Sequence, residues 1–493
     1  MPGRVDMRSV MRSSGQKFHR PRLTARQFIR FEPWKHSKHS TKRLLVIGVL
    51  DARSQARWIR GHRIFKRPGK VNQSHIPVAR GHAPRVLFYP LNTATMEKLG
   101  PAPRKEITRA LTFAALAVLA VLSWQALTVH VNYQGNWTGL FRIGYRTKLP
   151  PASAQGVFRN SNPTGYDGQY YRIMAHNPLL RDGTVAFLDD PLMRSRRILV
   201  PALAWLLVAG RQGLIDGAYV FVILAFIFAG TYWMVRLQIS AGRHPAWGLC
   251  FLAVPAVLIA VDSMTVDVAI AALAAGFAWH LTTGRASALW LILVASALVR
   301  ETGLLLPAAC VLASMYRRDW RKATLWATTA LPAFCWYGYV HAVLAASGAG
   351  HLALAPHFMI PRLELGILRQ ALEPQSYARF SPLLRTVAQG LDELALAGTV
   401  AVVVLVVVRS RHVRPLAQRT ALVLYVLMFA AITSKIFWSD AYSYSRAFAP
   451  LFVLPMAGDR PRTALLLALL VDLRILAEFE SQALHVLQWL AFR

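Results

Sequence analysis

Residues 110–129, ALTFAALAVLAVLSWQALTV, form a stretch that decides the fold class. A membrane-spanning helix needs about 20 predominantly apolar residues, because the hydrocarbon core is roughly 30 Å thick. A short basic segment with Lys98, Arg104, Lys105 and Arg109 precedes this stretch. Basic residues favour the cytoplasmic end of a membrane helix, so we expect the chain to leave the cytoplasm here.

Ten further apolar runs follow along the chain. They lie at residues 198–209, 214–235, 246–260, 266–281, 286–315, 325–346, 394–408, 421–436, 447–456 and 463–477, with a weaker run at 483–492. Several are shorter than a full span, so tilted, broken or re-entrant helices are expected. The pattern predicts an all-α, polytopic integral membrane protein with about 11 transmembrane helices.

The positive-inside rule orients the later runs. Basic clusters at residues 317–322, 409–419 and 460–462 mark cytoplasmic loops. The alternation of sides holds if residues 286–315 form one long span that is broken near Arg300. Two long loops, at residues 131–196 and about 347–391, then lie on the extracytoplasmic face.

The composition excludes several classes of protein. The 493 residues include 57 Lys+Arg and 23 Asp+Glu, a net charge of +34, but only 16% are charged and 55% are hydrophobic. A soluble domain has about 25% charged residues, so a disordered chain, a collagen-like chain and a disulfide scaffold are excluded, and a soluble nucleic-acid binder is disfavoured. Cys250, Cys310 and Cys335 lie in apolar stretches, where we expect small core residues.

More than half of the net charge lies in residues 1–95, which contain 21 Lys+Arg and 3 Asp+Glu. Three interpretations remain open for this segment: a cytoplasmic arm on anionic lipid, a nucleic-acid-binding arm, or upstream translation ahead of a true start at Met96. We assign it no function. The membrane domain is expected at residues 96–493. Its expected partner is the lipid bilayer and not nucleic acid.

The first long loop contains the string NSNPTGYDGQYYRIMAHNP at residues 160–178. Asp167 precedes Gly168, and the residues behind it suit a short amphipathic helix on the membrane surface. A carboxylate there can act as a general base on a sugar hydroxyl or bind a divalent cation. The alternative is an ordinary turn beside an interfacial aromatic belt.

The string DDPLMRSRRILVP follows at residues 189–201. Asp189 and Asp190 form a candidate site for a divalent cation such as Mg²⁺ or Mn²⁺. Arg194, Arg196 and Arg197 are candidates to hold a lipid phosphate or pyrophosphate, because guanidinium binds phosphate bidentately. A solvated flank of a helix is the alternative interpretation.

Further ionisable and aromatic candidates lie in or beside later apolar runs. Arg300 and Glu301 are either an ion pair that closes a helix break or contacts to a lipid phosphate. Arg446 is a second candidate phosphate ligand, and Tyr442 and Tyr444 are candidates to line a sugar or prenyl site. The alternative for these three is an interfacial belt with a flanking charge.

Asp262 and Asp267 are five residues apart, about 140° around an ideal helix, so they need not share one face. The expected topology places them on the cytoplasmic side, away from the extracytoplasmic candidates. We therefore favour structural or helix-capping roles for both.

The string GYDGQYYRIMAHNP and the following DDPLMRSRRILVPALAW resemble the bacterial cell-surface glycopolymer formation proteins, which belong to the GT-C class of polytopic glycosyltransferases. The resemblance covers about residues 110–460. A related Trp-Asp-Gly string occurs in the second mannosyltransferase of glycolipid-anchor assembly, where this chain has Tyr166. His176 and Asn177 also depart from relatives that have an acidic residue there.

The resemblance implies a hexosyl- or mannosyl-type transferase in the inner (plasma) membrane of a bacterium. Its donor would be a polyprenyl-phosphate sugar, and its acceptor a glycan or lipid-linked molecule. The catalytic carboxylate would be Asp167, with Tyr166, Gln169 and Tyr170 as candidate substrate contacts beside it.

Two rival interpretations come from other classes of protein. A transporter or lipid flippase would also need many spans, but it predicts repeat symmetry and no long outer loops. A non-catalytic scaffold in envelope assembly predicts that Asp167, Arg197 and Arg446 do not converge.

Overall fold

The computed structural model describes residues 104–348, 366–373, 375, 377, 381–458 and 460–492. The chain divides into two compact units, Met1–Phe88 and Tyr89–Arg493, and every described residue belongs to the second. The three interpretations of residues 1–95 fall outside the described residues and stay predictions.

The described residues form helices and no β-strand, which confirms the all-α class. The helices up to residue 346 are α1 Arg104–Asn132, α2 Gly168–His176, α3 Pro191–Arg196, α4 Leu199–Leu207, α5 Ile215–Ser240, α6 Pro255–Ser263, α7 Asp267–Thr283, α8 Ala286–Val299, α9 Leu305–Tyr316, α10 Trp320–Ala327 and α11 Leu331–Ala346. The later helices are α12 Gly366–Leu372, α13 Pro382–Arg409, α14 Leu416–Ala431, α15 Lys435–Trp438, α16 Ala441–Ala447, α17 Ala449–Ala457, α18 Pro461–Ala477 and α19 Glu480–Ala491.

Three of the described helices are long and apolar enough to cross a membrane, as a helical membrane protein requires: Arg104–Asn132, Gln212–Ser240 and Pro382–His412. A 3₁₀ segment, Pro245–Ala253, and α6 are bent by 62° and make a fourth candidate if they count as one span. Other apolar helices, such as α7 and α14, have 10–17 residues. The total of about 11 spans therefore stays a prediction.

Helix starts follow local capping rules, and one of them changes the expected loop boundaries. The Ser381 side chain accepts a hydrogen bond from the Leu384 amide. Pro382 occupies the first helical position of α13, where a backbone N–H would have no partner within the helix, so its missing N–H costs nothing. The helix thus begins well before the apolar run at residues 394–408. The second long loop, expected to reach about residue 391, is correspondingly shorter.

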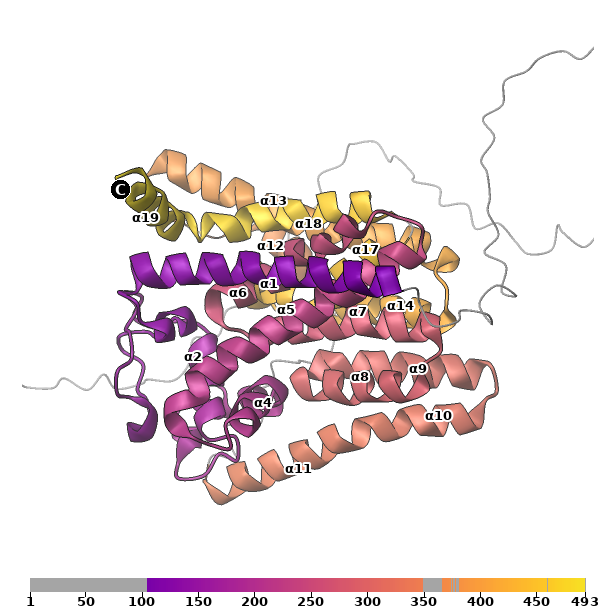
Figure 1. Cartoon of the computed structure of the whole chain (residues 1–493), viewed down its shortest axis with the longest axis horizontal. Helices are drawn as coiled ribbons and strands as arrows, with labels where there is room; N and C mark the ends of the chain where they lie inside the picture. The colour runs from indigo at the N-terminus through magenta and orange to yellow at the C-terminus, as the bar shows by residue number, and fades with distance from the viewer. Residues whose placement is uncertain are drawn as a thin grey trace, which may run out of the picture. The chain divides into compact units, whose positions relative to one another are not determined.

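The chain reverses direction between α8 and α9. The Ser296 hydroxyl donates to the Gly303 carbonyl at 3.2 Å, and a Cβ on Gly303 would collide with the Ser296 carbonyl oxygen. On a straight helix, residues seven apart are separated by about 10 Å. Because Ser296 and Gly303 are in direct contact, the chain turns back here, and α8 and α9 lie side by side (Figure 1). The chain therefore does not continue in one direction through residues 286–315, and the alternation of sides stays a prediction.

Short helices gather at one end of the long ones, where the chain leaves α1. In Figure 1, α2 and α4 lie at this left-hand end of the view. The longest helix between Asn132 and Leu199 is α2, with nine residues, so this segment is built of loops and short helices as expected. Of the three cysteines, Cys250 and Cys310 are buried, whereas Cys335 is exposed and is not the core residue that we expected.

Candidate functional site

Two loop segments cross at Gly144 and Gly165 and carry Asp167 to the start of α2. The Asn160 amide donates to the Ile143 carbonyl at 2.7 Å, and the Tyr166 amide donates to the Arg142 carbonyl at 2.9 Å. Gly165 has a φ of +64°, and a Cβ on either glycine would collide with the backbone of the other. Glycine is therefore required at both positions for close approach, and at Gly165 also for conformation.

The Asp167 carboxylate lies between two guanidinium groups. One oxygen accepts from Arg194 of α3 and the other accepts from Arg446 of α16, both at 2.7 Å. Burial raises the pKa of Asp167, but Arg446 and Arg194 together outweigh burial and hold this pKa well below its usual range. Asp167 is therefore an ionised carboxylate whose side chain is 16% exposed.

Asp267, at the start of α7, belongs to the same group of charges. Its carboxylate pairs with Arg300 and lies 3.5 Å from the Arg446 guanidinium. The expectation that Asp267 lies away from the other candidates is wrong. The left-handed residue Met264 turns the chain between α6 and α7, and this turn brings Asp267 beside α16.

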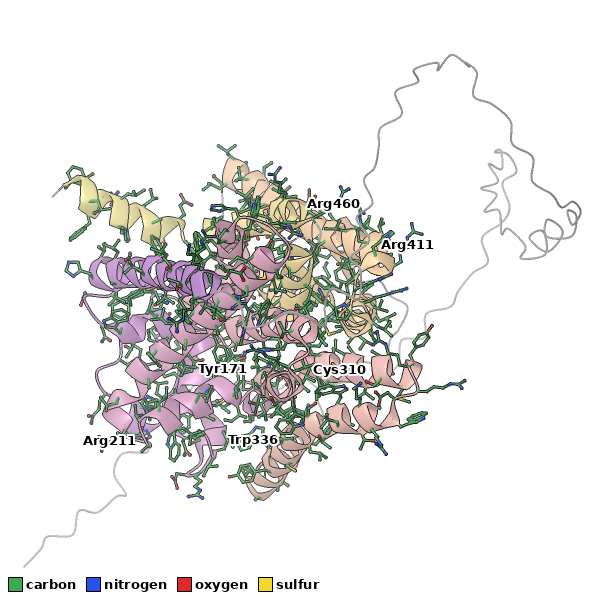
Figure 2. The ribbon with its side chains drawn as sticks, turned by 45° about the vertical axis from the view of Figure 1, so that its right-hand side comes forward. Tyr171, Arg211, Cys310, Trp336, Arg411 and Arg460 are labelled. Atoms are coloured by element: carbon green, nitrogen blue, oxygen red, sulfur yellow. The ribbon has the colours of Figure 1, made fainter. Side chains whose placement is uncertain are left out.

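Arg197 joins the group through Tyr171. Its Nη1 donates to the Tyr171 hydroxyl at 3.0 Å, and its Nε donates to Glu301 at 3.2 Å. The Tyr171 ring lies under the Arg194 guanidinium, 5.7 Å from its carbon, and Figure 2 places Tyr171 in the interior. Arg300 and Glu301 have different partners, so the interpretation of a pair that closes a helix break does not hold.

These residues form a charged cluster of four guanidinium and four carboxylate groups. Its members are Arg194, Arg197, Arg300, Arg446, Asp167, Asp189, Asp267 and Glu301. Charges removed from water are costly unless they are paired, and here every charge has an opposite partner. All of these residues except Asp267 are among the site residues predicted from the sequence.

Two tyrosines cover the cluster. Arg446 lies over the Tyr166 ring at 5.2 Å from its centroid, and Tyr166 meets Tyr442 edge to face at 5.5 Å. Arg194 lies over the Tyr170 ring at 5.1 Å. These contacts place Tyr166 and Tyr170 beside Asp167, as the sequence string indicates.

Gln169 has a positioning role in the loop. Its Oε1 accepts from the Gly144 amide at 3.1 Å and from the Thr147 hydroxyl at 2.8 Å, and its Nε2 donates to the Thr164 carbonyl at 2.7 Å. The side chain is buried. Because these hydrogen bonds tie the 144–147 and 164 segments to α2, Gln169 is not the substrate contact that we expected.

Two other predicted substrate contacts lie outside the cluster. Arg196 approaches His341 at 3.0 Å and lies over the Tyr337 ring. Tyr444 is buried and packs against Trp438, with ring centroids 5.7 Å apart. Residues two apart on a helix point toward nearly opposite sides. Arg196 therefore cannot face Asp167 together with Arg194.

Asp189 and Asp190 are engaged with groups of the protein. Both oxygens of Asp189 accept from Arg194, each at 2.9 Å, and Asp190 caps α3 by accepting from the Met193 amide at 3.0 Å. Across the ranges that the structure describes, no three His, Cys, Asp or Glu side chains are grouped to hold a metal ion. The pair is thus not arranged as the cation site that we expected.

Two cavities open beside the tyrosines that cover the cluster. The Tyr166 cavity, about 190 Å³, is lined by Tyr166, Tyr442, the amides of Asn160 and Asn162, the guanidinium of Arg142, and the carboxylates of Asp440 and Glu478, among others. The Tyr170 cavity, about 290 Å³, is lined by Tyr170, Asp189, Arg146, Lys148 and neighbouring loop residues. The first is polar and acidic, and the second is basic.

A network of charges that was not predicted from the sequence lies beside the Tyr166 cavity. Arg142 pairs with Asp262 at 2.6 Å, and Asp262 accepts from the Ser263 hydroxyl. The Tyr166 hydroxyl and the Arg142 Nε are buried without a hydrogen-bond partner among the described residues. A carboxylate in an apolar run was the available signal for Asp262, but the expected topology placed it away from the other candidate residues.

No protein-family model matches the chain, and no curated protein or solved structure matches it. The resemblance to GT-C glycosyltransferases therefore rests on the two sequence strings.

Proposed function

We propose that this protein is a membrane glycosyltransferase. It would move a sugar from a polyprenyl-phosphate donor to a cell-surface glycan or lipid-linked acceptor on the extracytoplasmic face. One observation carries the proposal: the Asp167 carboxylate lies between two guanidinium groups, beside one polar cavity and one basic cavity. Helices of membrane-spanning length in the same unit suit a donor that is a lipid.

The proposed step is a single displacement at the anomeric carbon. Asp167 takes the proton of an acceptor hydroxyl, and the oxygen forms a bond to that carbon. The bond from carbon to the phosphate oxygen breaks, and the phosphate leaves with the electron pair. Positive groups near the leaving oxygen stabilise the charge that develops there, and one displacement inverts the anomeric carbon.

Asp167 becomes a better base when its arginines turn to the donor. With both oxygens occupied by guanidinium groups, its pKa is too low for efficient proton transfer. A donor phosphate that attracts Arg194 or Arg446 would relieve this constraint and raise the pKa. The base would then be activated only when donor is bound, which limits wasteful hydrolysis.

The test is Asp167→Asn in a transfer assay with membranes or purified protein and a short-chain prenyl-phosphate sugar. Loss of the base should lower kcat by about 10²- to 10⁴-fold. Wild-type transfer by a well-expressed variant would overturn the assignment of Asp167. Absence of transfer by the wild type itself would instead favour a transporter or a scaffold.

A charge-matched double variant separates chemistry from folding. Asp167→Asn alone leaves one guanidinium uncompensated, which costs about 3–5 kcal/mol in a buried pair. Asp167→Asn with Arg446→Gln restores the balance of the cluster. We expect the double variant to recover thermal stability but no transfer; recovery of both would mean that Asp167 is purely structural.

A further inference from the structure

The charged cluster has no spare positive charge for an incoming anion. Its four guanidinium groups already face four carboxylates, so an anion that takes one of them leaves a carboxylate unpaired. Breaking such a buried pair is costly. A donor phosphate that draws Arg194 or Arg446 away from Asp167 therefore binds favourably only if additional cations lie close to the cluster.

Arg146 and Lys148 supply such cations. They line the Tyr170 cavity together with Tyr170 and Asp189, the residues that contact Arg194 of the cluster. No carboxylate in the described part of the chain forms an ion pair with either of them. Both side chains are exposed, and the guanidinium of Arg146 lies over the exposed Tyr145 ring, 5.5 Å from its centroid. A ligand can therefore reach both cations without breaking an ion pair.

The loop that carries these cations is held in place. The Thr147 hydroxyl, between Arg146 and Lys148, donates to the buried Gln169 side chain at 2.8 Å. The Arg146 amide also donates to the Pro163 carbonyl at 3.2 Å. Two cations on a fixed backbone beside a cavity of about 290 Å³ form a preorganised arrangement, not a loose basic tail.

We propose that the Tyr170 cavity is a subsite for a phosphate group, with Arg146 and Lys148 as its cationic ligands. Guanidinium binds phosphate oxygens bidentately, and ammonium adds a point charge. The inference rests on the proposed function, because it assigns the donor phosphate to this cavity. The Tyr166 cavity has amides, tyrosines, two carboxylates and one guanidinium, Arg142, which is already paired with Asp262. It therefore suits an uncharged sugar better than an anion.

A binding experiment on the full chain tests the subsite without any transfer reaction. The probes are farnesyl phosphate, farnesol and inorganic phosphate, added to the purified protein in nanodiscs of uncharged phosphatidylcholine. We expect farnesyl phosphate to bind at least about tenfold more tightly than farnesol. Arg146→Ala with Lys148→Ala should weaken farnesyl phosphate about tenfold or more, as loss of charge-assisted hydrogen bonds predicts.

Two further variants make the result specific. Arg146→Lys with Lys148→Arg keeps both charges and should retain most of the affinity. Arg317→Ala with Arg321→Ala removes the same charge from an exposed segment around the start of α10 and should leave binding unchanged. Equal weakening by this control would mean that only net charge matters, and it would overturn the subsite.

The remaining outcomes identify the ligand and separate the two proposals. If inorganic phosphate competes with farnesyl phosphate, the ligand of the subsite is a free phosphate or a phosphate ester. If it does not compete, the ligand is a lipid headgroup. Unchanged binding after removal of Arg146 and Lys148, or no preference for the phosphate over farnesol, overturns the subsite. The Asp167→Asn variant should lose transfer but still bind farnesyl phosphate. Failure of the proposed function would appear in the transfer assay, whereas failure of the subsite would appear in the binding assay.

Discussion

At the scale of single residues, Asp167 lies beside arginines that were also chosen from the sequence, but its ionisation state is unexpected. The sequence string singles out this aspartate, whereas its two arginine partners make it a strongly stabilised anion. A free carboxylate would be a stronger base. Under the proposed function, these ion pairs describe the site before a ligand redistributes its charges.

The lowered pKa of Asp167 predicts a pH window for stability. A carboxylate whose pKa is depressed on folding stabilises the folded state above its unfolded pKa of about 3.9, and this contribution is lost as pH falls further. We expect the Tm difference between wild type and Asp167→Asn to stay constant from about pH 8 to pH 5. It should shrink below about pH 4 in thermal unfolding of the detergent-solubilised protein.

A difference that already shrinks between pH 7 and pH 5 would contradict the lowered pKa. The charge-matched variant, Asp167→Asn with Arg446→Gln, provides the control. It lacks the Asp167 carboxylate, as Asp167→Asn does, so the Tm difference between these two variants should not change with pH over this range.

At the scale of elements, α2 is placed by contact between backbones. A Cβ on Gly168, the first residue of α2, would collide with the carbonyl oxygen of Ser263 at the end of α6. This close approach brings Asp167 beside the turn that carries Asp262 and Asp267. The position of the site thus depends on the absence of one methyl group.

Gly168→Ala should displace α2 from α6. We expect a loss of about 1–3 kcal/mol of stability, as overpacking typically causes, together with loss of transfer activity. Thermal unfolding and the transfer assay measure the two effects. The matched control is Gly217→Ala in α5, where a Cβ meets nothing within 4 Å and alanine should be neutral or stabilising by about 0.5–1 kcal/mol.

At the scale of the whole molecule, the hairpin of α8 and α9 changes the topology that charge patterning suggests. These helices have 14 and 12 residues, so each is shorter than the roughly 20 residues of a full span. Because the chain turns back between them, the segments before α8 and after α9 should face the same side of the membrane.

Cysteine labelling tests this arrangement. Arg285→Cys, before α8, and Arg321→Cys, after α9, would each be introduced with Cys335→Ser, since Cys335 is exposed and the other two cysteines are buried. A membrane-impermeant maleimide should label both positions in the same preparation, either intact spheroplasts or inverted vesicles. Labelling in opposite preparations would restore a single span through residues 286–315.

The sequence by itself determined the all-α membrane class, because apolar runs and helix periodicity are local properties that need no knowledge of contacts. It also identified Asp167, Arg194, Arg197 and Arg446, because charges in loops and at membrane depth are conspicuous in an apolar chain. Only the tertiary structure decided which charges meet. Asp167 and Arg446 are 279 residues apart, and Asp267 joins them through the α6–α7 turn.

The errors have the same physical origin. Arg196, Gln169 and Tyr444 are near the site in sequence, but helix geometry turns Arg196 away, and packing occupies the other two side chains. The reversal at Arg300 depends on a backbone contact between Ser296 and Gly303 that hydropathy does not encode. Composition and spacing specify which elements form, whereas close packing between distant segments specifies which side chains share a site.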